Sequence, residues 1–377
     1  MSGPLAQTPE ITHLLYPRAE TPAEADGLAW VFKSKQEFVP YYFKFPELSS
    51  TDVRAKVTFT GLCQSDVMTG REHWGPCNFP LCPGHEVVGE ITHVGADVKG
   101  VKIGDQVAVG PIRNHCGECT HCKKQDDNLC TEMDDSERFL YGLYFGGYAT
   151  HIQINYEHVF HIPEGMDASN IPPILCAGIT VYAPMKRWIK EQAGARVGVI
   201  GIGGLGHLAV QYGKAMGHHV VAFTTSADKV DYIKKLGAAE VIVVDKELKE
   251  LAKHRNSIHY LVNTLPISSP EILEGYLQTV APNGTLIQVG MPNENEKFSI
   301  SFATLILKQL NLAGSIVASI KDTQDCLNFS HKHGVKVEVE EFSFENFPKA
   351  LDRLENGRPV FRCVVNVQDY AKAHFPK

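Results

Sequence analysis

The chain has 377 residues, 44% of them hydrophobic and 21% charged, which is typical of a globular protein large enough for two domains. Its 36 basic and 43 acidic residues give a formal net charge of −7 without long blocks of one sign, which argues against nucleic acid or anionic lipid as a partner and favours a small-molecule substrate. The first residues lack the apolar stretch of a secretory signal, so we expect a cytoplasmic protein. The most apolar segment, 197–210, is too short to cross a bilayer, so we expect no membrane segment.

Residues 1–26 are rich in proline, alanine, threonine and glutamate without an apolar period, which predicts an extended or loosely docked tail. From residue 27 onward, short β-branched runs at 53–60, 85–94 and 106–109 alternate with glycine, proline and asparagine turns. This pattern predicts a mostly antiparallel β domain, to which we assign residues 27–176.

Ten cysteines in a long chain without an export signal are expected to stay reduced, and metal binding is then their most specific use. Cys63 and Cys176 lie far apart in the sequence, and His85 lies between them in a Pro-Gly-His-Glu segment. Two thiolates and one imidazole leave a fourth position for water or substrate, as a catalytic zinc requires. Each residue alone is equally well explained as a buried cysteine or a hydrogen-bonded core histidine, so only the combination favours a metal site.

A second cysteine group is compact, since Cys116, Cys119, Cys122 and Cys130 share one polar loop. Four thiolates at these spacings can close a tetrahedron around zinc and leave no position for chemistry, which predicts a structural site. Disulfide pairing is the alternative, and a reducing compartment disfavours it.

After Pro172 and Pro173 the chain changes to short apolar strands that alternate with helical segments. The segments lie at 196–200, 205–216, 219–223, 239–244, 260–263 and 285–288. Such alternation predicts a doubly wound parallel sheet over residues 177–317, with residues 318–377 returning to the β domain.

A glycine-rich loop, Gly201-Ile-Gly-Gly-Leu-Gly206, joins the first of these strands to the following helix. Gly201 permits the tight turn, Gly203 lets the backbone approach a pyrophosphate, and Gly206 lets helix and strand pack closely. The helix N-terminus offers free N–H groups to phosphates, so Gly204 and Leu205 belong to the expected site. A flexible loop is the alternative, but the strand before it and the helix after it favour dinucleotide binding.

The second strand of the parallel sheet runs into Thr224, Thr225 and Ser226, with Lys229 close behind. An NAD site places Asp or Glu there to accept from the 2′-hydroxyl of the ribose. Hydroxyls and an ammonium instead suit a 2′-phosphate, which predicts NADP(H) over NAD(H). A solvated turn with an incidental lysine is the alternative.

From about residue 29 to 367, the chain resembles the zinc-dependent medium-chain alcohol dehydrogenases, most closely the cinnamyl-alcohol dehydrogenase branch. The resemblance is carried by the segments around Cys63, His85 and Cys176, by the four-cysteine loop, by Gly146-Gly-Tyr-Ala149 and by the glycine-rich loop. It implies a GroES-like catalytic domain joined to a Rossmann cofactor domain, with two zinc ions per chain. It also implies hydride transfer between NADP(H) and a primary alcohol or aldehyde, in a homodimer or homotetramer.

The resemblance also implies roles for individual residues. By it, Cys63, His85 and Cys176 hold the catalytic zinc, and Glu86 sits beside the ion as an exchanging ligand. Asp66 does not bind the metal but orients the ring of His85.

In alcohol oxidation, Ser65 is expected to take the alcohol proton while hydride passes to the nicotinamide. Thr180 is expected to lie against the nicotinamide, and Gln64 is expected to bind the cofactor. The family often places a histidine five residues after the first cysteine ligand to pass this proton to solvent, and this chain has Met68 there. The proton route beyond Ser65 therefore runs either through the cofactor ribose and water or through His73.

The substrate pocket is the least determined feature, because Trp74 either walls a pocket for aromatic or medium-chain aldehydes or is a core residue. Two other functions remain open. One is a zinc-free quinone or enone reductase of the same superfamily, and the other is a non-catalytic NADPH-binding protein that keeps the ligand residues as relics.

Overall fold

The computed structural model describes residues 15–140, 142–293, 295–297, 299–357 and 361–375. These residues divide into two compact units. The first, here the β unit, holds the described residues up to Cys176, Ala318–His331 and those from Val337 onward, and the second, the α/β unit, holds Ala177–Val317 and Lys332–Lys336. No helix in the described part of the chain has the length and apolar character needed to pass through a membrane.

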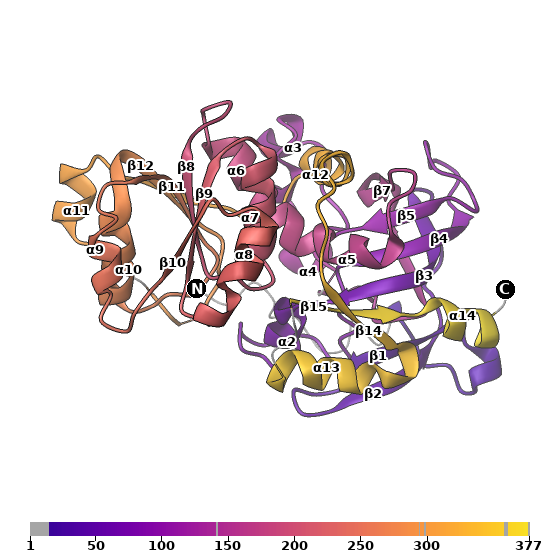
Figure 1. Cartoon of the computed structure of the whole chain (residues 1–377). Helices are drawn as coiled ribbons and strands as arrows, with labels where there is room; N and C mark the ends of the chain where they lie inside the picture. Colours follow the sequence, from indigo (N-terminus) through magenta and orange to yellow (C-terminus); the bar gives the residue numbers. More distant parts are fainter. Residues whose placement is uncertain (1–14, 141, 294, 298, 358–360, 376–377) are drawn as a thin grey trace. The chain divides into compact units, whose positions relative to one another are not determined.

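The β unit is built on a mostly antiparallel sheet (Figure 1). In the described residues its seven strands include the path β14-β15-β3-β4-β5-β7, with β6 paired to β3, and only β14 and β15 pair in parallel. The strands are β3 (Asp52–Leu62), β4 (Val87–Val94), β5 (Gln106–Val109), β6 (His151–Asn155), β7 (Val159–His161), β14 (Val339–Ser343) and β15 (Arg362–Asn366). The predicted mostly antiparallel architecture is confirmed.

A two-stranded sheet of β1 (Gly27–Phe32) and β2 (Phe38–Phe43) completes the strands of this unit that the structure describes. Its helices are short apart from α12 and α13. They are α2 (Gln64–Gly70), α3 (Thr120–Lys123), α4 (Asp135–Arg138), α5 (Ile171–Pro173), α12 (Ile320–His333), α13 (Phe347–Asn356) and α14 (Gln368–His374).

Sheet register explains why residues distant in sequence meet at the ends of three neighbouring strands. Leu62 lies opposite Cys363 on β15, and Thr60 lies opposite Val87 on β4. The residue after β3, the residues before β4 and the first residue of β15 are therefore neighbours. The strand predicted to begin at His85 begins at Val87, so His85 lies outside the ladder, just before β4.

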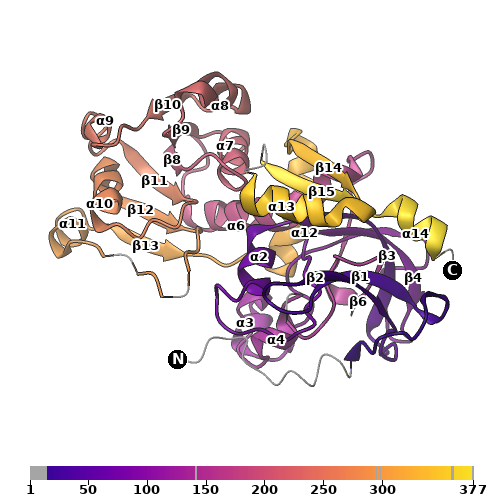
Figure 2. The ribbon, with the colours of Figure 1, turned by 90° about the horizontal axis from the view of Figure 1, so that it is seen from below.

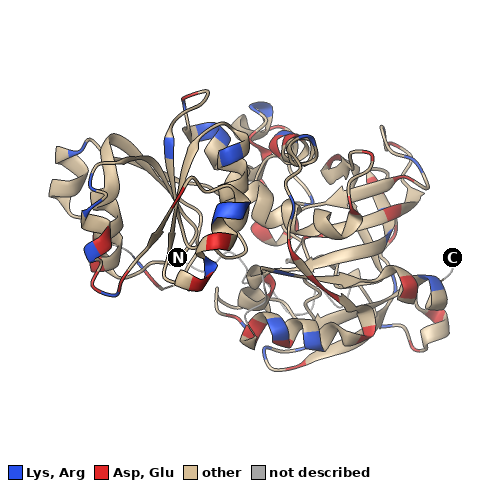
Figure 3. Ribbon diagram, in the orientation of Figure 1, with Lys and Arg blue, Asp and Glu red and all other residues tan. Residues whose placement is uncertain are grey.

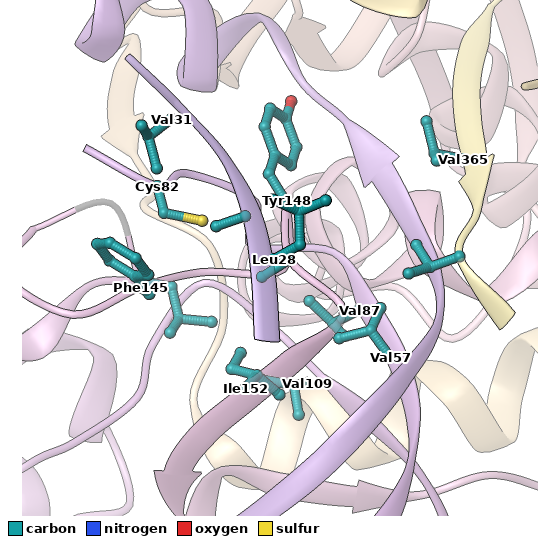
Figure 4. Close-up of a cluster of buried hydrophobic side chains, with 14 of the residues drawn as sticks. Leu28, Val31, Val57, Cys82, Val87, Val109, Phe145, Tyr148, Ile152 and Val365 are labelled. Atoms are coloured by element: carbon teal, nitrogen blue, oxygen red, sulfur yellow. The ribbon is translucent and has the colours of Figure 1, made fainter. Parts of the chain in front are cut away.

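The core of the β unit is a continuous aliphatic and aromatic cluster (Figure 4). It draws side chains from several strands, including Leu28, Val31, Val57, Val87, Ile152 and Val365. Tyr148 stands at this cluster, and Figure 4 shows its hydroxyl directed away from Leu28. This orientation leaves the ring packed and the hydroxyl available to a polar partner.

The packed structure begins earlier than the predicted boundary at Gly27. Tyr16 is fully buried and its ring stacks on Phe145 with centroids 4.3 Å apart, while Arg18 pairs with Phe43. One large aromatic ring fixes this segment without any local apolar period, which is why composition suggested a loose tail. Residues 1–14 of the predicted tail lie outside the described residues.

The α/β unit contains a parallel sheet with strand order β10-β9-β8-β11-β12-β13 in the described residues. The strands are β8 (Arg196–Ile200), β9 (His219–Thr224), β10 (Glu240–Val243), β11 (Ile258–Asn263), β12 (Val280–Gln288) and β13 (Asn311–Gly314). The helices are α6 (Ile179–Trp188), α7 (Gly206–Ala215), α8 (Val230–Leu236), α9 (Lys249–Ala252), α10 (Pro270–Thr279) and α11 (Phe302–Leu307). The predicted doubly wound sheet is confirmed.

Helices cover both faces of this sheet, with α6, α7 and α8 on one side and α9 and α10 on the other (Figures 1 and 2). Local sequence signals set several helix ends: Ser269 accepts a hydrogen bond from Ile272 N at the start of α10, and Gly237 takes a left-handed conformation at the end of α8. The strand order reverses direction between β8 and β11, where doubly wound sheets bind their ligands. The glycine-rich loop follows β8 at that point.

Candidate functional site

Cys63 lies where β3 ends and α2 begins, and Asp66 fixes this junction. The Asp66 carboxylate accepts a hydrogen bond from Cys63 N at 3.0 Å, which closes the first turn of α2. Ser65 Oγ lies 3.6 Å from Cys63 Sγ, and Gln64 is exposed. The helix start thus places the thiol and the Ser65 hydroxyl side by side.

His85 is held between the same carboxylate and a second sulfur. Its Nδ1 lies 2.9 Å from Asp66 Oδ1, and its Nε2 lies 3.2 Å from Cys176 Sγ. Burial acts to lower the pKa of His85, but the Asp66 carboxylate and the Cys63 sulfur together raise it well above its usual range. Asp66 thus engages Nδ1, and Nε2 is the ring nitrogen that faces the Cys176 sulfur.

Cys176 lies on a π-helical turn, Ile174–Gly178, between α5 and α6. Such turns are rare and recur at functional sites because the extra residue redirects a side chain. Cys63 Sγ and Cys176 Sγ are 3.8 Å apart, the separation of about 3.8 Å that two Zn–S bonds of about 2.3 Å at tetrahedral angles produce. The hydrogen bond from Cys176 holds the pKa of Cys63 well below its usual range, which favours the thiolate that binds metal.

Donor atoms of Cys63, His85, Glu86 and Cys176 all lie within 4.8 Å of one another, and all four residues are buried. Their donor set, two sulfurs and one imidazole with a carboxylate in reach, is one that zinc prefers. The residues therefore fit a zinc ion, as the sequence predicted.

Glu86 has a partner that the sequence analysis missed. Its Oε1 accepts a hydrogen bond from Arg362, the first residue of β15, while its Oε2 has no hydrogen-bond partner among the described residues. Oε2 lies against Gly61, where a Cβ would come within 2.0 Å of it. Burial raises the pKa of Glu86 to about 7, with Arg362 opposing the shift. No sequence motif predicts the role of Arg362, because only the pairing of β15 with β3 brings it close to Glu86.

The four-cysteine loop forms a second group whose sulfurs also lie within 4.8 Å of one another. Cys119 Sγ and Cys116 Sγ are 3.4 and 3.8 Å from Cys122 Sγ, too far for disulfides and suited to a shared ion. Backbone N–H groups of Cys122 and Thr131 lower the pKa of Cys119 to about 5. The geometry fits a structural zinc with no open position.

Two side chains brace this loop. Arg138 donates to the carbonyl oxygens of Asn128 and Cys130, at 2.9 and 3.1 Å. Asp127 accepts from Ile320 N, at the start of α12, with its oxygens 3.0 and 3.2 Å away. The loop is thereby tied to a helix that lies almost two hundred residues later in the chain.

The glycine-rich loop has the form that the sequence predicted. Gly201 has a φ of 81°, which an L side chain rarely adopts, and a Cβ on Gly206 would lie 1.8 Å from Gly201 O. Gly203 is exposed, and a Cβ there would meet nothing within 4 Å. The backbone at Gly203 is thus open to a phosphate, while Gly206 is required by packing.

Comparison with known proteins agrees with this geometry. Residues 49–164 match the family model described as alcohol dehydrogenase GroES-like domain, and residues 204–332 match the one described as zinc-binding dehydrogenase. Cinnamyl alcohol dehydrogenase 8 of Arabidopsis thaliana is 34% identical over 337 residues, 88% of this chain and 92% of its own length. Cinnamyl alcohol dehydrogenase 1 of Capsicum annuum is 33% identical and covers 91% of this chain and 96% of its own.

The chain belongs to the zinc-containing medium-chain alcohol dehydrogenases. Solved structures agree: a cinnamyl alcohol dehydrogenase from Sorghum bicolor, 29% identical, superposes with a TM-score of 0.83 over 91% of this chain and 98% of its own. CAD from Helicobacter pylori, complexed with NADP(H), is 30% identical with a TM-score of 0.82 over the same shares. The resemblance predicted from the sequence is confirmed.

In this zinc-containing alcohol dehydrogenase, the residues expected to meet the adenosine ribose lie at the end of β9. Thr224 is the last residue of the strand and is buried, and its Oγ1 accepts from Ser226 N at 3.1 Å. Thr225 and Lys229 are exposed. The sequence predicts no carboxylate that would repel a 2′-phosphate, yet the exposed Asp228 shares this turn.

The remaining predicted residues fall in both units. Met68 is half-buried in α2, in the β unit, where the family often has a relay histidine, and His73 is exposed in the segment after that helix. Trp74 is half-buried in the same segment. Thr180 is half-buried near the start of α6 in the α/β unit.

Proposed function

We propose that this zinc-containing dehydrogenase moves hydride between NADP(H) and a primary alcohol or aldehyde of aromatic or medium-chain type. The observation that carries the proposal is the convergence of Cys63, His85, Glu86 and Cys176 on one buried point. A structural zinc site uses all four ligands, whereas three ligands and an exchangeable carboxylate leave room for a substrate oxygen. The relatives named as cinnamyl alcohol dehydrogenases support the substrate class.

The residues of the β unit divide the chemistry among them. When bound, zinc supplies Lewis acidity, which acidifies an alcohol and polarises an aldehyde carbonyl. Ser65, next to Cys63 Sγ, accepts the alcohol proton in oxidation while its own hydroxyl proton passes on towards water, and the reverse relay delivers a proton in reduction. Asp66 holds His85 in the orientation that presents Nε2. Arg362 donates a hydrogen bond to Oε1 of Glu86, and Oε2 remains available as a metal ligand that water can replace.

A direct test measures NADPH oxidation by the purified protein with a panel of aromatic and medium-chain aldehydes, and with quinones and enones. We expect turnover with the aldehydes. Turnover with quinones or enones alone supports the zinc-free type of reductase. If the protein binds zinc at both sites but oxidises NADPH with none of these compounds, the result supports a non-catalytic NADPH-binding role.

For the cofactor, we propose NADP(H) with the glycine-rich loop on the pyrophosphate and Thr224, Thr225, Ser226 and Lys229 around the 2′-phosphate. The hydroxyls and the ammonium favour this phosphate, while Asp228 opposes it. The relative strength of these charges decides the preference.

Lys229→Ala should raise the KM for NADPH about tenfold and leave the KM for NADH unchanged, because a hydrogen bond to a charged group contributes about 1.5–3 kcal/mol. Steady-state kinetics with both cofactors measure the effect. Lys234→Ala, an exposed lysine on the adjoining helix α8, serves as the control and should change neither constant. An equal change for NADPH and NADH on Lys229→Ala would contradict the proposed contact.

For assembly, we propose a homodimer formed through α11 and the edge strand β13. Phe302, Ile306 and Leu307 on α11 are 81%, 66% and 82% exposed, and Leu312 on β13 is 45% exposed. An edge strand beside an exposed apolar helix is the kind of surface that a second copy covers. Helix α11 itself contains no charged residue, and Lys308, which follows it, is buried. Elsewhere, acidic and basic residues are mixed over both units (Figure 3).

Leu307→Asp should convert the dimer to a monomer at micromolar concentration, because a carboxylate would have to be buried at the contact. Light scattering coupled to size-exclusion chromatography gives the mass. Ile103→Asp, a residue 62% exposed in the β unit, is the control and should leave the dimer intact. A wild-type protein that is monomeric under these conditions would refute the assembly.

A further inference from the structure

The segment Gly146-Gly-Tyr-Ala149 packs along the residues that immediately precede His85. Gly146 N donates to Cys82 O at 2.8 Å, Tyr148 N to Pro83 O at 3.0 Å, and Gly147 N to Gly84 O at 2.7 Å. Three consecutive amides of one segment therefore hold three consecutive carbonyls of the other. The backbone that carries the metal-ligand histidine is fixed from this side.

Both segments need glycine because their backbones touch. A Cβ on Gly146 would lie 2.5 Å from Gly84 O and 2.6 Å from Pro83 O. Gly84 has a φ of 103°, and a Cβ there would lie 2.6 Å from Tyr148 N. This close approach brings the Tyr148 side chain next to the residues that hold the metal site.

The Tyr148 hydroxyl reaches the carboxylate that orients His85. It donates to Asp66 Oδ2 at 2.8 Å, while Asp66 Oδ1 lies 2.9 Å from His85 Nδ1 and accepts from Gly84 N at 2.9 Å. With Cys63 N also donating to Oδ2, four groups converge on one carboxylate. Asp66 and Tyr148 are both fully buried, so water cannot replace a lost donor at low cost. Burial and the Asp66 charge raise the pKa of Tyr148, so the phenol keeps the proton that it donates.

We propose that Tyr148 is a positioning residue for the catalytic metal site, because its hydroxyl fixes the Asp66 carboxylate and, through it, the orientation and metal affinity of His85. This inference rests on the proposed catalytic zinc. A ligand histidine gains basicity and a fixed ring plane from a carboxylate behind it, and the carboxylate needs its own donors to stay in place.

A purely structural role would act through the ring instead. Tyr148 packs against Phe347, with centroids 4.5 Å apart, and more distantly against Phe38 at 6.4 Å. Phenylalanine at position 148 keeps these contacts and removes only the hydroxyl. The variant Tyr148→Phe therefore separates the two roles.

The experiment measures zinc affinity of the full-length protein by competition with a chromophoric chelator. The four-cysteine loop supplies an internal reference, because its ion should be retained in every variant. We expect Tyr148→Phe to bind the catalytic zinc about 10–100-fold more weakly, the range typical when a group behind a metal ligand is removed. In the Co²⁺-substituted protein, the visible absorption bands of the catalytic site should shift.

Tyr41→Phe is the matched control. Tyr41 is a buried tyrosine of the same unit whose hydroxyl donates one hydrogen bond, to Tyr16 O at 3.1 Å. Removal of the Tyr41 hydroxyl should leave the affinities of both zinc sites and the Co²⁺ spectrum unchanged. Thermal melts of the two variants check that the loss of a buried hydrogen bond is comparable.

A double-mutant cycle gives a second test. Asp66→Asn should weaken the same zinc, and adding Tyr148→Phe to it should cost little more, because the hydroxyl acts through the carboxylate. Additive losses, or a Tyr148→Phe protein with wild-type affinity at both sites, would overturn the positioning role. A wild-type protein that binds one zinc only, at the four-cysteine loop, would instead overturn the proposed function.

Discussion

Cys63→Ser and His85→Ala are expected to abolish turnover, with kcat reduced more than ~10³-fold, because the several kcal/mol of charge stabilisation supplied by a metal ion is lost. The two side chains and Cys176 form one buried donor set, so removing either leaves too few ligands to hold the ion. NADPH binding should survive with an unchanged Kd, since the glycine-rich loop belongs to the other unit.

Rates with an aldehyde substrate and NADPH fluorescence titrations check both halves of this prediction. Cys326→Ser is the control, because Cys326 is a buried cysteine of α12 that belongs to neither metal group. Full activity in Cys63→Ser or His85→Ala would refute the catalytic role of this site. Loss of NADPH binding together with activity would point to misfolding instead, which the control and a thermal melt would reveal.

The second large effect is expected at the four-cysteine loop, where Cys119→Ser should remove one of two zinc ions per chain and destabilise the β unit. Metal closure of a loop of about 15 residues acts like a cross-link and is worth about 3 kcal/mol. For a domain of this size we expect Tm to fall by about 6–12 °C. With the ion gone, Arg138 and Asp127 remain as braces, and Asp127 also holds the start of α12.

Metal analysis gives the zinc content per chain, and calorimetry gives the Tm. Hydrogen exchange should show earlier opening at the start of α12. Turnover measured well below the new Tm should stay within a few-fold of wild type, because no residue of the loop belongs to the catalytic group. Cys77→Ser, a half-buried cysteine outside both groups, is the control. A Cys119→Ser protein that keeps two zinc ions and its Tm would contradict the structural role.

Several parts of the fold could be predicted because the signals are local. β8 runs over Arg196–Ile200 and the glycine-rich loop follows it, since an apolar β-branched run and a glycine triplet act over neighbouring residues. The start of the packed structure at Tyr16 could not be predicted in this way. A single ring stacked on Phe145 gives no periodic pattern.

The same contrast applies within the candidate site. Cys63, His85 and Cys176 were identified by residue type and by short motifs, and the structure brings them together. Arg362 lies 276 residues from its partner Glu86, and Tyr148 lies 82 residues from Asp66. Tyr148 belongs to a segment that carries the family resemblance, but the local sequence names neither its partner Asp66 nor the partner of Arg362.

The sequence by itself determined the kind of chemistry, because ligand type, glycine spacing and strand–helix alternation are written in consecutive residues. The tertiary structure alone decided which buried groups support that chemistry. Pairing of β3 with β4 and β15 sets Glu86 beside Arg362, and the backbone contact between residues 146–148 and 82–84 sets the Tyr148 hydroxyl on Asp66. These partners are fixed by sheet register and by close backbone packing, which depend on the whole fold rather than on any one segment.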